Sequence, residues 1–341
     1  MSKPVRVGLV GGGMWGRVHL DGIRELGATR AETRWICTRT RSNLEQLQKE
    51  YGVDRGTTDY REMLADPELD AVIVSTPPFL HAEQGLAVLE AGKHLLLEKP
   101  MATSRADAAR LVDAAAARPQ QVSLEASCRF SRLSPKYPFI KDLVESGRIG
   151  RVYHIHHHQM SPQTFADYNP RSHEWANDPE RAGGGPIVDW GPYDFAFHLG
   201  LIGDPTPPDA IHAVARVESG IERHAIAVIE LDGGVTYQLE RIQGMPYQEA
   251  SRTRIHGTLG TLAFGYQPWE PQEIELSTRS ADGGLVRETL HCPYTRAWHE
   301  NTYLLDHFVA CISGVAQPIM PFPLAKRNLD LSLGILDKIR G

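Results

Sequence analysis

The sequence contains little cysteine and no long apolar segment. Its four cysteines stand far apart in 341 residues, and no two of them form a C-x-x-C motif. This usage argues against a metal or disulfide framework and favours buried free thiols in a reducing compartment. No segment reaches the ~18 consecutive apolar residues of a membrane span, and Met1 leads into a strand-like segment without a signal-peptide pattern. We therefore expect a cytoplasmic protein with no membrane partner.

The sequence also has fewer positive than negative charges. The 36 lysines and arginines are outnumbered by 42 aspartates and glutamates, which leaves a net charge of -6. A chain with this balance has no general attraction for nucleic acid or anionic lipid. We expect no nucleic-acid partner, and any anion site must be built locally from a few groups. The length indicates about two domains of ~150 residues each.

Short apolar strands alternate with amphipathic helices in the first part of the chain. The pattern predicts strands over 5–10, 33–37, 70–75, 94–97 and 121–127, and helices over 14–26, 43–51, 81–91 and 106–117. Such alternation is typical of a parallel sheet wound on both faces by helices. We therefore predict a doubly wound α/β domain over residues 1–125.

The rest of the chain, residues 126–341, is rich in strands. Predicted strands cover 151–160, 211–218, 224–232, 234–243, 252–257 and 285–291, and a final helix covers 324–340. Turn signals at Asp232-Gly233-Gly234 and Asp282-Gly283-Gly284 indicate hairpins. This pattern predicts a large, mostly antiparallel sheet with one covered and one open face, in a second, substrate-binding domain.

A glycine-rich loop follows the first strand. Gly11, Gly13 and Gly16 fit G-x-G-x-x-G, with Met14 and Trp15 between the last two glycines. The first glycine permits a tight turn, the second lets the backbone approach a pyrophosphate, and the third lets strand and helix pack closely. Because the loop lies between a strand and a helix, it predicts a dinucleotide-binding Rossmann domain rather than a plain turn.

The second strand ends without the acidic residue that would bind a ribose 2′-hydroxyl. Thr38, Arg39 and Arg41 stand there instead. They could bind a 2′-phosphate through hydrogen bonds and charge pairing, so we expect NADP(H) as the preferred cofactor and NAD(H) as possible. The alternative is that the two arginines lie on a solvated loop.

Two further strands also end in polar residues. Thr76, Pro77 and His81 follow one of them, and Glu98 and Lys99 follow the next. Ligands bind at the carboxyl ends of strands in open α/β sheets. We therefore count all five residues among the cofactor-binding candidates, with Lys99 also a candidate for catalysis.

Three segments resemble one known family. GGGMWG, TPPFLHAEQGLAVLEAGKHLLLEKP and AGGGPIVDWGPYD are similar to motifs of the glucose–fructose oxidoreductase / inositol dehydrogenase (Gfo/Idh/MocA) family, and the likeness covers essentially the whole chain. The resemblance implies a Rossmann domain followed by an α/β domain with a large antiparallel sheet. It also implies an NAD(P)-dependent dehydrogenase or reductase of sugars, polyols and related compounds, and a homodimer or homotetramer formed through the open sheet face.

The same resemblance implies three catalytic residues. Lys99 would be the catalytic-site lysine, and a helix would carry Asp189 and, four residues later on the same face, Tyr193. Most members have histidine at that place, and members such as glucose–fructose oxidoreductase and dimeric dihydrodiol dehydrogenase use tyrosine as the acid. Pro192 is tolerated if it falls in the first helical turn, where its missing N–H breaks no bond. From the residues alone, Asp189 could equally be a helix N-cap and Tyr193 a buried aromatic.

Three more residues are candidate substrate contacts. They are Arg129, which could equally be a structural salt-bridge partner, Trp175 and His156. The run His154–His158 suggests zinc at first sight, but three converging ligands with supporting groups are not indicated. We therefore expect no metal.

These features together predict hydride transfer between a nicotinamide and a carbinol or carbonyl carbon of a sugar-like small molecule. Tyr193 would exchange the hydroxyl proton, Lys99 would polarise the oxygen, and Asp189 would orient them. The rival hypothesis is a non-catalytic dinucleotide-binding regulator of the same fold.

Overall fold

The computed structural model describes residues 3–206, 210–293 and 299–341. These residues cluster into two compact units. The first contains the chain up to Arg129, Glu180–Gly183 and a C-terminal segment that ends at Leu329; the second contains Phe130–Pro179, the chain from Gly184 through the last strand, and Asp330–Gly341. The first unit thus takes in a C-terminal segment that lies outside the predicted range 1–125. The functional roles given to the two predicted domains stay predictions.

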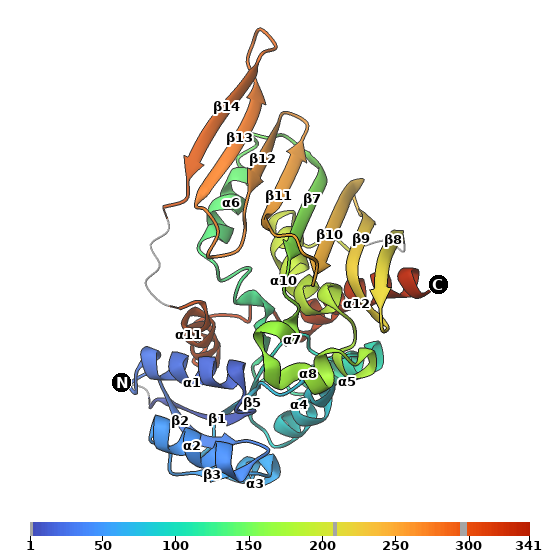
Figure 1. Cartoon of the computed structure of the whole chain (residues 1–341). Helices are drawn as coiled ribbons and strands as arrows, with labels where there is room; N and C mark the ends of the chain where they lie inside the picture. Colours follow the sequence, from blue (N-terminus) through green and yellow to red (C-terminus); the bar gives the residue numbers. More distant parts are fainter. Residues whose placement is uncertain (1–2, 207–209, 294–298) are drawn as a thin grey trace. The chain divides into compact units, whose positions relative to one another are not determined.

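The first unit is built on a six-stranded parallel sheet (Figure 1). The strands lie in the order β3-β2-β1-β4-β5-β6, which is that of a doubly wound dinucleotide-binding sheet. They are β1 Val5–Val10, β2 Ala31–Cys37, β3 Gly56–Thr57, β4 Ala71–Val74, β5 His94–Leu97 and β6 Ser123–Glu125. Every residue of β4 is buried because helices cover both faces of such a sheet. The predicted α/β class is confirmed.

All four helices predicted for this part of the chain are present. They are α1 Met14–Leu26, α2 Arg41–Tyr51, α4 His81–Glu90 and α5 Arg105–Ala116; the short β3 and α3 Tyr60–Leu64 were not predicted. Another helix of the unit, α11 Glu300–Ile312, packs on α1. A Cβ atom on Gly22 would lie 2.6 Å from Leu305 Cδ1, so the glycine allows the two helices to approach closely.

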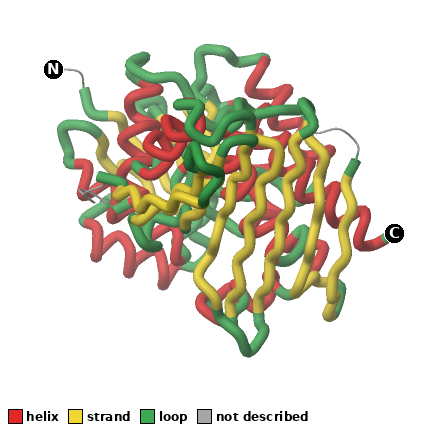
Figure 2. Tube along the Cα trace, turned by 90° about the horizontal axis from the view of Figure 1, so that it is seen from above, coloured by secondary structure: helices red, strands yellow, loops and turns green. Residues whose placement is uncertain are grey.

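The second unit is built on an eight-stranded sheet. Figure 2 shows strands of this sheet lying side by side. Its order is β14-β13-β12-β11-β7-β10-β9-β8, and every pair is antiparallel except β7 with β10. The strands are β7 Val152–Ser161, β8 Ile211–Glu218, β9 Ile221–Leu231, β10 Val235–Gln243, β11 Glu249–Gly257, β12 Gly260–Phe264, β13 Glu273–Arg279 and β14 Leu285–His291. The mostly antiparallel sheet is confirmed, while β12 and β13 were not predicted.

One face of this sheet is covered by a long helix, α10 Pro186–Leu201 (Figure 1). Ile155, Tyr237 and Leu239 of the sheet form a core with Phe195 and Phe197 of α10. The alternate residues of β7 and β10 point to the other face and are mostly polar and partly exposed. The predicted division into a covered and an open face is therefore present.

The remaining helices are mostly short. They are α6 Lys136–Glu145, α7 Phe165–Tyr168, α8 His173–Ala176, α9 Pro179–Ala182 and the C-terminal α12 Phe322–Arg340, with single turns η1 Pro78–Leu80, η2 Ala126–Cys128 and η3 Pro170–Ser172. All four cysteines are buried and none takes part in a disulfide, as predicted. Within the described ranges, no helix combines the length and apolar character needed to cross a membrane.

Candidate active site

The glycine loop between β1 and α1 has the geometry that the motif predicts. Gly11 has φ +107° and its N–H donates to Cys37 O at 2.9 Å. A Cβ on Gly11 would lie 2.7 Å from the Ser75 carbonyl, and one on Gly16 would lie 1.9 Å from Gly11 O. Neither position can accept a side chain, because backbone atoms, which cannot move aside, occupy the space.

The start of α1 suits a dinucleotide phosphate. Gly13 is its N-cap and offers no side-chain acceptor to the first N–H groups, and the first turn, with Met14 and Trp15, has no acidic residue. A Cβ on Gly13 would meet no protein atom within 4 Å, so the loop is open at this point. The N–H groups at a helix N-terminus and the helix dipole attract an anion. The residues present therefore fit the phosphates of a nicotinamide dinucleotide.

The end of β2 is tied to this loop by a residue that we did not predict. Asn43 Nδ2 donates to Gly12 O at 3.1 Å and to the hydroxyl of the buried Thr38 at 3.0 Å. Arg39 is exposed, and the exposed Arg41 pairs with Glu45 at 3.3 Å. The structure thus places Thr38 beside the glycine loop, whereas Arg39 and Arg41 are exposed after the end of β2.

His81 joins the loops that follow β4 and β5. Its Nδ1 lies 2.8 Å from Pro100 O and its Nε2 lies 2.8 Å from Thr76 O. The imidazole is buried, and burial lowers its pKa. A neutral imidazole donates to only one of these two carbonyl oxygens, and the ring lies between the Thr76-Pro77 turn and the Lys99-Pro100 turn inside the unit.

The carboxylate of Glu98 is the centre of a buried ion cluster. Arg129 Nη1 donates to Glu98 Oε1 at 2.6 Å, and His19 Nε2 lies 2.9 Å from the same oxygen. Burial raises the pKa of Glu98, but Arg129 and His19 together hold it well below its usual range. Glu98 Oε2 also accepts the backbone N–H of Lys99 at 3.2 Å, so the cluster fixes the backbone that carries the predicted catalytic lysine.

Arg129 is completely buried in this cluster. Its guanidinium lies 3.9 Å from the centre of the Trp15 ring and also donates to Asn301 Oδ1 at 3.0 Å. The structural salt bridge that the sequence left open for Arg129 is therefore present, whereas its contact with substrate stays a prediction.

Asp189 and Tyr193 lie one turn apart on α10 in the second unit. The buried carboxylate of Glu222 on β9 caps this helix, accepting the N–H groups of Gly185 at 2.8 Å and Ile187 at 3.2 Å. Pro192 lies in the helix interior and not in the first turn, so the condition under which its missing N–H breaks no bond is not met. The reason is that the helix begins earlier, at Pro186, which takes the first-turn position itself.

Tyr193 belongs to a closed ring of four aromatic side chains, which we call the aromatic quartet: Phe130, Trp190, Tyr193 and Trp269. Ring centroids are 5.1 Å apart for Phe130–Tyr193, 5.4 Å for Trp190–Tyr193, 5.2 Å for Phe130–Trp269 and 6.4 Å for Trp190–Trp269. Tyr193 itself is 1% exposed. Packing on two neighbouring rings fixes the plane of the phenol.

A second buried ion cluster lies directly after Tyr193 in the sequence. Arg241 Nε donates to Asp194 Oδ2 at 2.7 Å, Tyr266 Oη donates to Asp194 Oδ1 at 2.7 Å, and His157 Nε2 lies 3.4 Å from the same oxygen. Burial raises the pKa of Asp194, but Arg241 and His157 lower it well below its usual range. The sequence analysis missed this cluster, although a charged residue among Tyr193, Phe195 and Phe197 was a visible signal.

His156 lies on the open face of the sheet. Its neighbour His157 points the other way, toward Asp194 of α10, and successive side chains of a strand alternate. His156 Nδ1 lies 3.3 Å from Arg254 Nη1, and its ring packs against that of His158. The contact of His156 with substrate stays a prediction. Among the residues that the structure describes, no group of three or more His, Cys, Asp or Glu is arranged to hold a metal ion.

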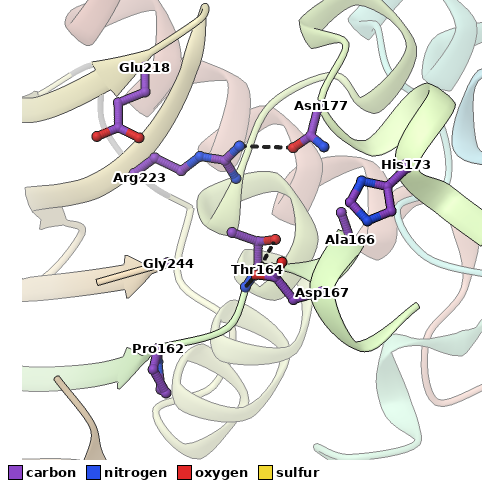
Figure 3. A pocket seen from close by; sticks show the side chains of 9 residues that line it. All are labelled: Pro162, Thr164, Ala166, Asp167, His173, Asn177, Glu218, Arg223 and Gly244. Atoms are coloured by element: carbon purple, nitrogen blue, oxygen red, sulfur yellow. Dashed lines mark hydrogen bonds between the residues drawn. The ribbon is translucent and has the colours of Figure 1, made fainter. Parts of the chain in front are cut away.

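The segment after β7, together with Glu218, Arg223 and Gly244, lines a small polar pocket of about 270 Å³ (Figure 3). Arg223 donates to Asn177 at 2.9 Å across it, and Asp167 accepts the hydroxyl of Thr164 at 2.8 Å. Trp175 comes from the same segment but does not line the pocket; it packs against Phe165, with ring centroids 5.4 Å apart. Its contact with substrate stays a prediction.

Comparison with known proteins agrees with this architecture. A family model described as an oxidoreductase family with an NAD-binding Rossmann fold matches residues 5–126, and the GFO/IDH/MocA C-terminal domain matches residues 137–263. A relative, 1,5-anhydro-D-fructose reductase of Ensifer adhaerens, is 30% identical over 73% of this chain and 74% of its own. The chain belongs to the Gfo/Idh/MocA family. It is therefore a nicotinamide-dependent oxidoreductase.

Other members of the Gfo/Idh/MocA family match along nearly the whole chain. The scyllo-inositol 2-dehydrogenase (NAD(+)) of Bacillus subtilis (strain 168) is 23% identical over 100% of this chain and 95% of its own. A solved structure of levoglucosan dehydrogenase in complex with NADH and levoglucosan superposes with a TM-score of 0.85 at 20% identity, over 99% of this chain and 97% of that one. The fold of both units is thus that of the family.

Proposed function

We propose that this Gfo/Idh/MocA protein is a dehydrogenase or reductase of a sugar, a polyol or a related hydroxyl compound. The family relatives named above act on an anhydrofructose, an inositol and levoglucosan. The observation that carries the proposal is the placement of Asp189 and Tyr193 one turn apart on α10, with the phenol fixed by the aromatic quartet. Such a pair can hold and exchange the proton of a substrate hydroxyl.

Each residue has a separate proposed role. Gly11, Gly13, Gly16 and the start of α1 hold the phosphates, and the bound nicotinamide supplies or accepts the hydride. Tyr193 exchanges the hydroxyl proton, Asp189 orients it, and Lys99 polarises the reacting oxygen. A phenol has a reference pKa of ~10, so Tyr193 needs a cation beside its hydroxyl to act as a base near neutrality, and we propose Lys99 for this role as well.

We propose NADP(H) as the preferred cofactor, with NAD(H) as possible. Supporting this choice, the end of β2 has no acidic residue to repel a 2′-phosphate, and Thr38, Arg39 and Arg41 can bind one. Steady-state kinetics with both cofactors test the preference. A kcat/KM clearly better with NADH than with NADPH would refute it.

The proposed activity is tested with purified protein and a panel of sugars, cyclitols and polyols. Reduction of NADP+ or oxidation of NADPH is followed by absorbance, and cofactor binding is measured separately by nucleotide fluorescence. An enzyme of this kind binds cofactor and turns over at least one compound. Binding of cofactor with no turnover across the panel would refute the proposal.

We also propose a homodimer or homotetramer formed through the open face of the eight-stranded sheet. This face carries half-buried side chains such as Gln238 and Glu240 of β10, whereas the opposite face is packed against α10. Static light scattering should give at least twice the chain mass of 37.9 kDa. A mass equal to that of one chain would refute this proposal.

A further inference from the structure

The aromatic quartet is unevenly exposed. Tyr193 is 1% exposed and Phe130 7%, whereas Trp269 is 57% exposed although it contacts two other rings of the quartet. An indole left in water gives up apolar burial that folding would otherwise gain. Large exposed aromatic surface next to polar groups is typical of a ligand site.

Trp269 is exposed on a loop that is firmly held. The buried ammonium of Lys136 lies within 2.9–3.0 Å of four carbonyl oxygens of this loop, those of Gly265, Gln267, Glu270 and Pro271. The buried Glu270 carboxylate accepts the N–H groups of Gln267 at 2.8 Å and Ser251 at 3.0 Å. The backbone around Trp269 is therefore fixed before any ligand arrives, which reduces the entropy lost on binding.

Trp190 is the other indole of the quartet and packs against the exposed Trp269. Its ring meets that of Trp269 at 77°, close to perpendicular. Arg241 lies 5.2 Å from the Trp190 ring, and Asp194 fixes the guanidinium of this arginine. The two indoles thus form an aromatic corner of Trp190 and Trp269, supported from behind by a buried ion pair and bordered by Tyr193.

We propose that this aromatic corner binds the ring of a cyclic polyhydroxyl substrate, a pyranose or a cyclitol, whose reacting hydroxyl goes to Tyr193. The inference rests on the proposed function, since it takes Tyr193 as the proton-exchanging group. The face of such a ring presents C–H groups, while its hydroxyls lie at the rim. An indole can therefore cover the face and leave the rim free for polar contacts. An open-chain polyol offers no such face.

Calorimetric titrations of the protein saturated with NADP+ test this inference directly. The probes are methyl β-D-glucopyranoside and myo-inositol, which are cyclic, and D-glucitol, which is open-chain. Trp269→Ala should weaken the binding of the cyclic probes about tenfold, in line with the loss of one stacked ring, and should leave D-glucitol within twofold. Trp269→Phe should restore most of the loss. Tyr247→Ala is the matched control, because Tyr247 is equally exposed, at 57%, and lies outside the quartet.

Steady-state kinetics on the best cyclic substrate complete the test, with KM expected to rise about tenfold in Trp269→Ala and kcat to fall much less. The inference is wrong if wild-type protein binds neither cyclic probe, or if Trp269→Ala affects cyclic and open-chain probes alike. It is also wrong if the variant changes only the mass seen by light scattering, which would make Trp269 a subunit contact. Cyclic probes that bind through Trp269 without turnover would support the aromatic corner and overturn the proposed catalysis instead.

Discussion

The two units contain buried ion clusters that are alike in composition and different in attachment. In the first, Arg129 pairs with Glu98 beside His19 and lies 3.9 Å from the Trp15 ring. In the second, Arg241 pairs with Asp194 beside His157 and lies 5.2 Å from the Trp190 ring. Each carboxylate is a direct sequence neighbour of a proposed catalytic residue, Lys99 in one case and Tyr193 in the other.

The difference lies in what each carboxylate does for its neighbour. Glu98 stands at the end of a strand and accepts the N–H of Lys99, so it acts on the backbone of the lysine. Asp194 is inside a helix, where N–H groups already have partners, and its oxygens take side chains from elsewhere in the unit. A loop residue is thus positioned through its own peptide bond, and a helix residue through the packing of its helix.

The largest expected effect concerns the helix residue itself. Tyr193→Phe keeps the ring in the quartet and removes the hydroxyl, so kcat should fall at least ~10²-fold, the usual contribution of a positioned acid. Tyr237→Phe removes a hydroxyl from an equally buried tyrosine of the same unit, one that contacts His198 instead, and should keep most of the activity. Near-full activity in Tyr193→Phe would make the phenol structural.

Breaking either arginine pair should destabilise the protein strongly. Arg129→Met or Arg241→Met leaves a buried carboxylate without its cation, at a cost of about 3–5 kcal/mol. Urea unfolding measures this loss, and the double variants Glu98→Gln/Arg129→Met and Asp194→Asn/Arg241→Met should recover much of it. Losses below about 1 kcal/mol in both single variants would show that water screens the two ion pairs.

The buried carboxyl of Glu125 extends the comparison through pH, because no arginine among the described residues pairs with it. Burial raises the pKa of Glu125 from 4.5 to about 7, so the folded state favours its protonated form. The protonated Glu125 therefore contributes to the free energy of unfolding. This contribution, on the order of 3 kcal/mol, is fully present below pH 4.5 and is lost as the pH rises to about 7. Glu125→Gln should remove that part of the pH dependence.

The measurement is the difference in unfolding free energy between pH 4.5 and pH 8, wild type against Glu125→Gln. Groups common to both proteins cancel in this comparison. Equal pH dependence in the two proteins would contradict the raised pKa of Glu125.

The smallest expected effect belongs to an ordinary helix end. Ser104 caps α5, and its hydroxyl accepts the N–H of Asp107 at 3.1 Å. Ser104→Ala should cost about 1 kcal/mol and leave kcat unchanged, and thermal unfolding with activity assays measures both. A cost as large as that of the arginine variants would remove the distinction between the clusters and routine local contacts.

The sequence predicted the first unit better than the second because local patterns define its elements. Strands such as β4 are continuous apolar runs, and a glycine-rich loop between a strand and a helix predicts a phosphate-binding turn. In the second unit, β12 was missed because it is only five residues long, and β13 because its alternation of Ile274 and Leu276 with glutamates was not used. Helix α11 of the first unit was missed as well, because the helical spacing of Leu304, Leu305 and Phe308 was not used.

The supporting contacts of the candidate site could not be predicted. The likeness to a known family identified Lys99, Asp189 and Tyr193, but the partners of their neighbours come from distant parts of the chain. Arg241 meets Asp194 across 47 positions, and Asn301 reaches Arg129 across 172. Sequence spacing carries no information on such pairs until the fold brings them together.

The single parallel pairing of β7 has a consequence for how the large sheet assembles. Strands β8–β10 form one meander of sequence neighbours, strands β11–β14 form another, and β7 lies between β10 and β11. The chain leaves β7 and passes through α10 before it returns to pair with β7 at β10. The meanders can form from local contacts, whereas inserting β7 requires closure of a long loop and is slower. Until that insertion, β10 and β11 each present a bare edge to other chains. Aggregation during refolding should therefore start at these two edges, and a peptide with the sequence of β7 should suppress it.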